Sequence, residues 1–405
     1  MNLGVYIQVP FCQTKCTYCN FHTGVVAPAK YRPYAAAVCR EISNVTARSD
    51  IATMQGTAVD TVYFGGGTPS LLEPATLAEI LDALKECGLR MPQNRAPADA
   101  TRGESARGTP EVTLEADPET ITREKAAAWR AAGFNRISLG VQSFNDAELH
   151  AAGRMHRSRD IFAASTILRS ADFNNISMDL IAGLAHQTRQ SWEESISRIL
   201  EIYPEHISIY MLEIDDGSRL GKESLAGGSR YSADAIPSDD AMAEFYESAC
   251  ARLDRAGYEH YEISNWGLPD FHSRHNQKYW RREPYMGFGA GAHSFDGNKR
   301  WSNFHDPAKY ASYIETGISP REQIDVVTPQ EALEEELFLG LRQLGGIDIA
   351  AIERRYKVNL GERLAPLRRN GLIELEGTQL RLAKDRLTIS NEVFVELLGE
   401  GAGRA

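Results

Sequence analysis

The chain has 405 residues, of which 42% are hydrophobic and 24% charged, and its formal net charge is −11. Such a composition lets a globular protein bury its own core, which excludes intrinsic disorder of the whole chain. The acidic balance disfavours DNA or RNA as the main partner, because binding to a polyanion depends on Lys and Arg. The first residues resemble no secretion signal, and no segment approaches the ~20 apolar residues of a membrane helix. We therefore expect a cytoplasmic protein without a transmembrane segment.

Six short runs rich in β-branched and aromatic residues alternate with helical stretches, and each run predicts a strand. The runs are residues 3–9, 58–64, 111–115, 136–142, 175–182 and 206–212. Strands that alternate with helices predict a parallel sheet with right-handed crossovers. Six βα units fit either a partial barrel or an open doubly wound sheet. In both folds, functional side chains gather at the carboxyl ends of the strands.

The remaining segments predict two irregular connections and a separate C-terminal module. Residues 92–110 contain few large apolar side chains and predict a surface insertion, and residues 215–240 predict a second connection. Helices over 329–344, 349–356 and 360–370, followed by a hairpin over 372–376 and 380–382, predict a winged-helix-like module. Its basic residues could contact nucleic acid, but the net charge favours a packing role. We therefore divide the chain into a core barrel (1–235), a barrel extension (236–325) and a C-terminal domain (326–405).

Three of the six cysteines form a cluster directly after the first predicted strand, with the spacing C-x3-C-x2-C. They are Cys12, Cys16 and Cys19. In a large chain without a secretion signal, clustered cysteines more often bind metal than form disulfides. Three thiolates on one loop can hold three irons of a [4Fe–4S] cluster and leave the fourth iron without a protein ligand. A structural zinc site with His22 as its fourth ligand is the competing interpretation.

The other three cysteines lie singly in predicted helices and are expected to be small packing residues. They are Cys39, Cys87 and Cys250.

The cysteine spacing after the first strand of a βα series resembles the radical S-adenosylmethionine (SAM) superfamily. Further motifs resemble one of its subfamilies, the oxygen-independent coproporphyrinogen III oxidases (HemN) and the HemW heme chaperones. The resemblance implies a partial (β/α)6 barrel, and a cluster whose open iron binds the amino and carboxylate groups of SAM. It also implies that an electron donor such as flavodoxin or ferredoxin reduces the cluster, so that SAM can be cleaved to a 5′-deoxyadenosyl radical.

The resemblance also implies which residues bind SAM. They stand in the settings Y-x-Q-x-P-F-C, G-G-G-T-P-S, T-L-E-A-D-P, G-V-Q-S-F, G-R-x-H and D-L-I-x-G-L. In chain order they are Tyr6, Gly66, Gly67, Thr68, Glu115, Gln142, Arg154 and Asp179. Acids and an amide suit the ammonium group and the ribose hydroxyls, and Arg154 suits the carboxylate. The subfamily's usual histidine two residues after Tyr6 is replaced by Gln8.

Two departures separate this chain from the oxidases of the subfamily. The oxidases carry a fourth cysteine two residues after the third, where this chain has Phe21, and a long arm before the tyrosine, where this chain has five residues. Residues 275–280 instead read H-N-Q-K-Y-W and match the H-N-x-x-Y-W motif of the chaperones. A histidine beside aromatic rings suits axial ligation of heme iron, so the resemblance implies His275 as a tentative heme ligand. The next candidates are His293, His272 and His22.

These features predict a heme chaperone that binds heme, SAM and one [4Fe–4S] cluster and transfers heme to an acceptor protein. A peripheral membrane contact could bring it to that acceptor. The competing hypotheses are an oxidase that decarboxylates coproporphyrinogen III, and a radical SAM enzyme acting on another substrate.

Overall fold

The computed structural model describes residues 2–44, 57–87, 89 and 109–398. Most of the predicted insertion over 92–110 lies outside the described residues. Within the described part of the chain, every helix is too short or too polar to cross a bilayer.

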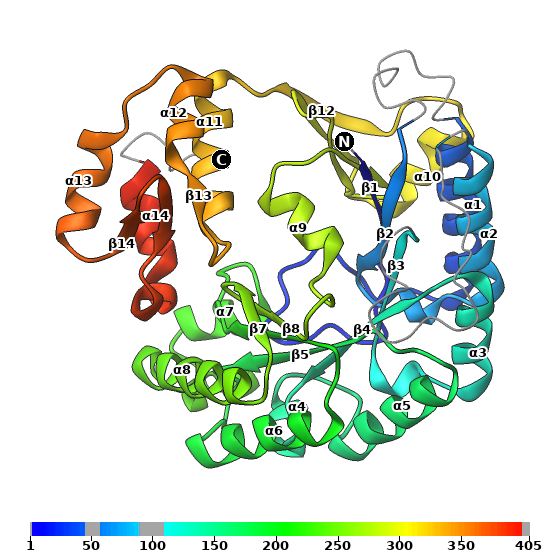
Figure 1. Ribbon diagram of the computed structural model, residues 1–405. Coiled ribbons are helices and arrows are strands. Elements are labelled where there is room, and N and C mark those ends of the chain that lie inside the picture. Colours follow the sequence, from blue (N-terminus) through cyan, green and yellow to red (C-terminus); the bar gives the residue numbers. More distant parts are fainter. Residues whose placement is uncertain (1, 45–56, 88, 90–108, 399–405) are drawn as a thin grey trace.

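Six parallel strands, in the order β1-β2-β3-β4-β5-β6, form the centre of a 12-stranded sheet. They are β1 (Leu3–Val9), β2 (Val59–Gly66), β3 (Glu111–Ala116), β4 (Arg136–Gln142), β5 (Ile176–Ala182) and β6 (His206–Met211). The prediction of six strands is confirmed, with ends that differ by no more than two residues. A doubly wound sheet would reverse its strand order at a switch point. The unbroken order, curved around a centre in Figure 1, is instead that of a partial (β/α)6 barrel.

Helices connect the strands and cover the outside of the barrel (Figure 1). They are α1 (Tyr31–Ser43), α2 (Pro74–Glu86), α3 (Arg123–Ala132), α4 (Asp146–Ala151), α5 (Ser158–Ser170) and α6 (Arg189–Ile202). Thr122 and Thr188 start α3 and α6, because each hydroxyl accepts a hydrogen bond from the backbone N–H three residues further on.

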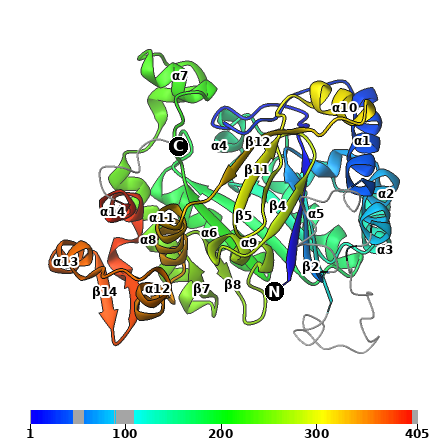
Figure 2. The same cartoon turned by 90° about the horizontal axis from the view of Figure 1, so that it is seen from above.

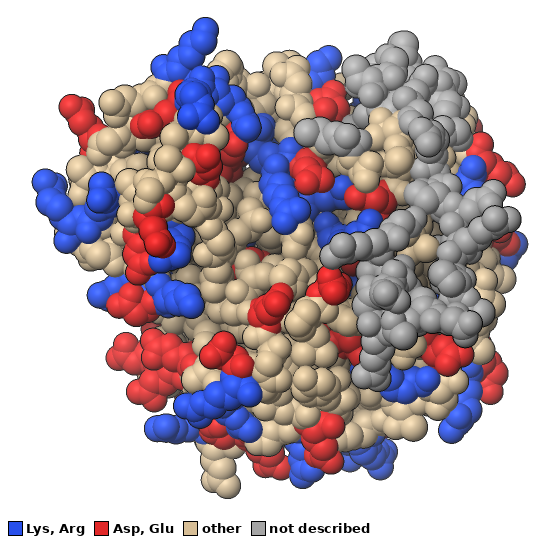
Figure 3. Space-filling view, viewed as in Figure 1, with Lys and Arg blue, Asp and Glu red and all other residues tan. Residues whose placement is uncertain are grey.

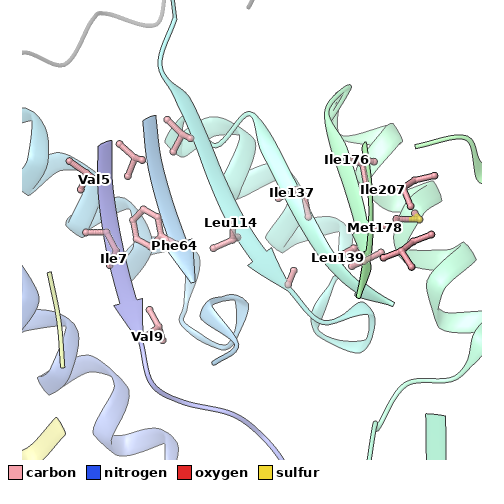
Figure 4. Packing of buried hydrophobic residues seen from close by; sticks show 14 of the residues in the cluster. Val5, Ile7, Val9, Phe64, Leu114, Ile137, Leu139, Ile176, Met178 and Ile207 are labelled. Carbon is pink, nitrogen blue, oxygen red and sulfur yellow. The ribbon is translucent and has the colours of Figure 1, made fainter. Parts of the chain in front are cut away.

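Alternation along the strands separates an apolar outer face from a polar inner face. The buried side chains in Figure 4 include Val5, Ile7, Val9, Phe64, Leu114, Ile137, Leu139, Ile176, Met178 and Ile207. Burying each such side chain contributes about 1.5–3 kcal/mol. The residues between them on the strands, such as Tyr6, Tyr63, Glu115 and Asp179, occupy the opposite face. The barrel interior is therefore lined by groups that can bind a polar ligand.

The sheet extends beyond both edges of the six strands. On the β6 side it continues with β8 (Asn265–Gly267) and β7 (Glu259–Glu262). On the β1 side it continues with β9 (Tyr285–Phe288), β10 (His293–Phe295), β11 (Lys299–Asn303) and β12 (Arg321–Val326). β9 is parallel to β1, with Tyr6 opposite Gly287, so residues after Phe288 emerge at the same end of the barrel as the cysteine loop. The extension also contains α10 (Pro307–Glu315).

The second predicted connection is more regular than expected. It contains α7 (Arg219–Leu225), and α8 (Asp239–Arg255) begins just before residue 240. Ser218 and Ser238 cap these two helices with their hydroxyl groups. The Gly, Ser and Asp content that predicted a loop therefore includes helix caps.

Helix α9 (Arg274–Trp280), which carries the H-N-Q-K-Y-W segment, lies inside the ring of elements in Figure 1. The Lys278 ammonium donates to the Asn2 carbonyl and pairs with Asp60, at the amino ends of β1 and β2. Figure 2 shows the same position for α9: the helix lies near the N-terminus, whereas the blue segment after β1 lies at the opposite end of the barrel. Acidic and basic side chains are intermixed on the face that α9 fills (Figure 3).

The C-terminal region forms its own three-stranded sheet, β13-β15-β14, beside four helices. The helices are α11 (Pro329–Leu341), α12 (Ile349–Tyr356), α13 (Gly361–Arg369) and α14 (Ser390–Leu398). The strands are β13 (Ile347–Asp348), β14 (Ile373–Glu376) and β15 (Gln379–Leu382). The three predicted helices and the hairpin are present, while β13 and α14 are additional. The Arg342 guanidinium stacks on Trp280, which connects this region to α9.

Candidate functional site

The loop that carries the three clustered cysteines is held against the rest of the barrel by backbone hydrogen bonds. The amides of Gly67 and Thr68 donate to the carbonyls of Val9 and Phe11, at 2.8 and 2.7 Å. The Thr17 amide donates to the Ala152 carbonyl at 3.1 Å. The loop after β2 and the end of α4 therefore fix the path of the cysteine segment.

Close packing explains two glycines that the sequence analysis assigned to the approach of a ligand. A Cβ on Gly67 would lie 2.4 Å from the Phe11 carbonyl oxygen, and a Cβ on Gly66 would lie 2.5 Å from the Gln8 amide. Gly66 also has a φ of +110°, which L side chains rarely adopt. The G-G-G-T segment thus approaches the cysteine loop itself, a contact that the local sequence does not reveal.

Cys12, Cys16 and Cys19 are free, partly exposed thiols on this loop. Burial raises the pKa of the Cys12 and Cys19 thiols, so a bound metal or a nearby cation is needed to favour the thiolates. The Arg154 guanidinium supplies such a cation, with Nη1 3.6 Å from the Cys16 sulfur. In the described residues no three His, Cys, Asp or Glu side chains converge on a single-ion site. In a cubane cluster each thiolate would bind a different iron, so the three thiols need not meet at one ion.

Arg154 connects the cysteine loop to Asp117, a residue that the sequence analysis did not select. One guanidinium nitrogen pairs with the Asp117 carboxylate and also donates to the Gly140 carbonyl at 2.9 Å. The Thr68 hydroxyl donates to the other Asp117 oxygen at 3.0 Å. Asp117 follows Glu115 in the T-L-E-A-D-P setting, which was the available signal. In this structure Arg154 links the cysteine loop to the ends of β3 and β4, and the Asp117 carboxylate partly compensates its positive charge.

Glu115 and Asp179 are acids on the inner face of the barrel. Glu115 accepts hydrogen bonds from the Tyr63 hydroxyl at 2.8 Å and from the Gly66 amide at 3.1 Å. Burial raises the pKa of Glu115 to about 7 and that of Asp179 to about 6. The Oδ1 atom of Asp179 is buried without a hydrogen-bond partner among the described residues. Such an acceptor is suited to a cationic or hydroxyl group of a ligand.

Gln142 ends β4 with a φ of +66°, a backbone conformation that is uncommon outside glycine. Its amide nitrogen, an Arg154 nitrogen and an Asp117 oxygen all lie within 3.2 Å of the position that a Cβ on Gly140 would occupy. These three polar groups are therefore brought together at the carboxyl end of β4. The predicted gathering of strand-end residues is found here in three dimensions.

Tyr6 lies deeper in the barrel than these groups. Its hydroxyl donates to Gln8 Oε1 at 2.8 Å, and its ring stacks with Tyr63 at a centroid distance of 6.1 Å. The glutamine at the subfamily's histidine position therefore has a defined role here, because it accepts from Tyr6 and packs against Gly66.

His275 is placed away from the cysteine loop, at the end of the barrel that α9 fills. Its side chain is 1% exposed. Nδ1 is 2.9 Å from the Thr61 hydroxyl, and Nε2 is 2.9 Å from the Tyr279 hydroxyl. Burial lowers the pKa of His275 to about 3, so the ring is neutral. Ligation of iron by either nitrogen requires the loss of one of these hydrogen bonds, and the role of His275 stays a prediction.

Comparison with known proteins agrees with this architecture. The family model for the radical SAM superfamily matches residues 6–199, and that for the HemN C-terminal domain matches residues 327–384. The structure is similar to coproporphyrinogen III oxidase (HemN) from Escherichia coli, a radical SAM enzyme, with a TM-score of 0.80 and 22% identity over 98% of this chain and 90% of that one. The barrel and its cysteine loop are therefore a radical SAM fold.

Two relatives define the family more narrowly. The heme chaperone HemW of Bacillus subtilis is 32% identical over 98% of this chain and 99% of its own. The heme chaperone HemW of Synechocystis is 36% identical over 91% of this chain and 84% of its own. The chain belongs to the HemW family of radical SAM proteins.

Proposed function

We propose that this protein is a heme chaperone that binds heme, SAM and one [4Fe–4S] cluster and transfers heme to an acceptor protein. The observation that carries the proposal is similarity over nearly the whole chain to proteins named as heme chaperones. The similarity to the oxidase is at 22% identity and therefore speaks to the fold alone.

The residues at the carboxyl ends of the strands fit a bound cluster and SAM. Cys12, Cys16 and Cys19 would hold the cluster, and the Arg154 guanidinium beside Cys16 would offset its negative charge. The unpartnered Asp179 oxygen and the carboxylate of Glu115 would take cationic or hydroxyl groups of SAM. The remaining proposed SAM contacts are Tyr6, Gly66, Gly67, Thr68 and Gln142. When bound, the reduced cluster would supply an electron to SAM.

SAM affinity should rise with pH, because the two inner acids must be ionised to bind a cation. With pKa values of about 7 for Glu115 and about 6 for Asp179, both are largely protonated at about pH 5.5 and ionised at about pH 8. We expect binding to the reconstituted protein to tighten roughly a hundredfold across this range, because only a small fraction of the molecules carry both charges at the lower pH. Equilibrium binding of labelled SAM at several pH values measures this effect.

An Asp179→Asn variant tests the role of the charge, since it keeps the size of the side chain and removes its ability to ionise. It should bind SAM more weakly at high pH and show a smaller pH dependence, with iron content unchanged. If its affinity and pH profile equal those of the wild type, Asp179 does not bind the cation.

A direct assay separates the chaperone from the oxidase. We expect purified protein to bind about one equivalent of heme and to form no protoporphyrinogen from coproporphyrinogen III with SAM and a reductant under anaerobic conditions. The basis is that Phe21 stands where the oxidases of the subfamily carry a further cysteine, and that residues 275–280 match the chaperone motif instead. Turnover of coproporphyrinogen III by this protein would establish the oxidase instead.

The partners follow from the same proposal. A flavodoxin or ferredoxin would reduce the cluster, and the protein would act in the cytoplasm, where its six free thiols stay reduced. A peripheral membrane contact would let it reach a membrane-bound acceptor.

A further inference from the structure

Three histidines outside the H-N-Q-K-Y-W segment meet beside the cysteine loop. His22 follows Cys19 by three residues, His293 begins β10, and His305 lies between β11 and α10. The ring centroids of His22 and His305 are 4.2 Å apart, and those of His293 and His305 are 6.4 Å apart. Figure 2 shows the blue segment after β1 next to α10, at the end of the barrel opposite to α9. We call these three residues the histidine cluster.

The rings of the histidine cluster have no polar partners among the described residues. Six of the ten histidines hydrogen-bond or ion-pair through their rings: His156, His186, His206, His260, His272 and His275. The remaining four are His22, His150, His293 and His305, so three of the four unpartnered rings lie together. His305 Nδ1 is buried against the backbone of Gly291, where an unsatisfied polar atom costs about 1–3 kcal/mol. This buried nitrogen is therefore available to a ligand.

The charge state of the histidine cluster favours ligation of a metal by its rings. Partial burial and the proximity of His305 lower the pKa of both His22 and His293. Both rings are therefore neutral near pH 7, and each keeps a nitrogen lone pair for a metal.

The arrangement of side chains at the histidine cluster suits a metal that already has other ligands. No three metal-binding side chains converge on one point in the described residues, so a bare ion would lack a complete ligand set. Iron held by the four nitrogens of a porphyrin needs only one or two axial imidazoles.

The surroundings of the histidine cluster also suit an amphipathic macrocycle. Phe21, next to His22, is 66% exposed, so its ring is accessible to a ligand. The Lys309 ammonium lies 3.8 Å from the ring centroid of Phe304, the residue before His305. Aromatic faces can stack on a porphyrin, and an ammonium can pair with a propionate.

We propose that the histidine cluster supplies the axial ligand of a porphyrin iron, with His305 at its centre. This inference rests on the proposed heme-binding function and names the site. It places heme beside the cysteine loop, at the opposite end of the barrel from His275.

The test is a hemin titration of the full-length reconstituted protein under anaerobic conditions, followed by the Soret band. The triple variant His22→Ala/His293→Ala/His305→Ala should bind hemin at least about tenfold more weakly and lose the wild-type Soret position. The iron–sulfur spectrum and the melting temperature should be unchanged, and added imidazole should restore the wild-type Soret position. The matched control is His150→Ala, an exposed histidine on α4, which should behave as the wild type.

Each other outcome decides against the inference. A triple variant with wild-type affinity and spectrum overturns it and leaves the heme chaperone function standing. Loss of the wild-type Soret position in His275→Ala alone would assign the ligand to α9 instead. Failure of the wild-type protein to bind hemin removes both the proposed function and this site.

Discussion

Replacing Cys12, Cys16 or Cys19 with alanine should prevent formation of a complete [4Fe–4S] cluster. Each thiolate would bind a different iron, so the loss of one would leave two irons without protein ligands, and a second open iron would make the cluster labile. After anaerobic reconstitution, we expect each variant to retain well under the roughly four irons per chain of the wild type. Iron analysis and Mössbauer spectroscopy measure the result.

The other three cysteines provide internal controls. Cys39 and Cys250 lie on the outer helices α1 and α8, and the Cys87 thiol donates to the Leu84 carbonyl at the end of α2. Their alanine variants should keep the full cluster spectrum. A complete spectrum in a Cys12, Cys16 or Cys19 variant would show that the ligands had been assigned incorrectly.

Gly67→Ala should lower the iron content nearly as strongly, although Gly67 has no side chain that could bind iron. The new Cβ would lie 2.4 Å from the carbonyl oxygen of Phe11 and 2.9 Å from its backbone nitrogen, so the cysteine loop must move. Overpacking of this kind typically costs about 1–3 kcal/mol. We expect a lower melting temperature, and iron content after reconstitution that falls with it.

Gly24→Ala is the matched control for this prediction. Gly24 lies on the same loop and hydrogen-bonds to Pro10 and Cys12, but a Cβ there would meet no atom within 4 Å. It should therefore retain the cluster and the melting temperature of the wild type. Equal iron content in the two glycine variants would mean that the contact between the G-G-G-T segment and the cysteine loop is not needed for assembly.

The structure changes the interpretation of the H-N-Q-K-Y-W segment. Two of its polar side chains already have protein partners: His275 with Thr61 and Tyr279, and Lys278 with Asp60. Taken alone, these contacts explain the segment as a helix that fills one end of the barrel. Nothing in the local sequence distinguishes a ligand from a packing residue, because the partners of His275 on β2 are more than 200 residues away in the chain.

The sequence by itself determined the local features of this protein. The six strands of the barrel, the first helices of the C-terminal region and the cysteine spacing all follow from short-range patterns of polarity, β-branched residues and glycines, and the structure agrees with them. These features depend on the backbone preferences and burial of neighbouring residues, which a short window of sequence contains.

What only the tertiary structure decided is which distant residues meet. The pairing of Arg154 with Asp117 and Cys16, the packing of Gly67 on Phe11, and the histidine cluster each join segments that a local pattern cannot relate. The strands β9 to β12 bring His293 and His305 to the cysteine loop because β9 adds to β1 in parallel, which fixes the end of the barrel where the chain emerges. Such contacts arise from the closure and extension of the sheet, and their physical cause is packing across the whole fold rather than the propensity of any one segment.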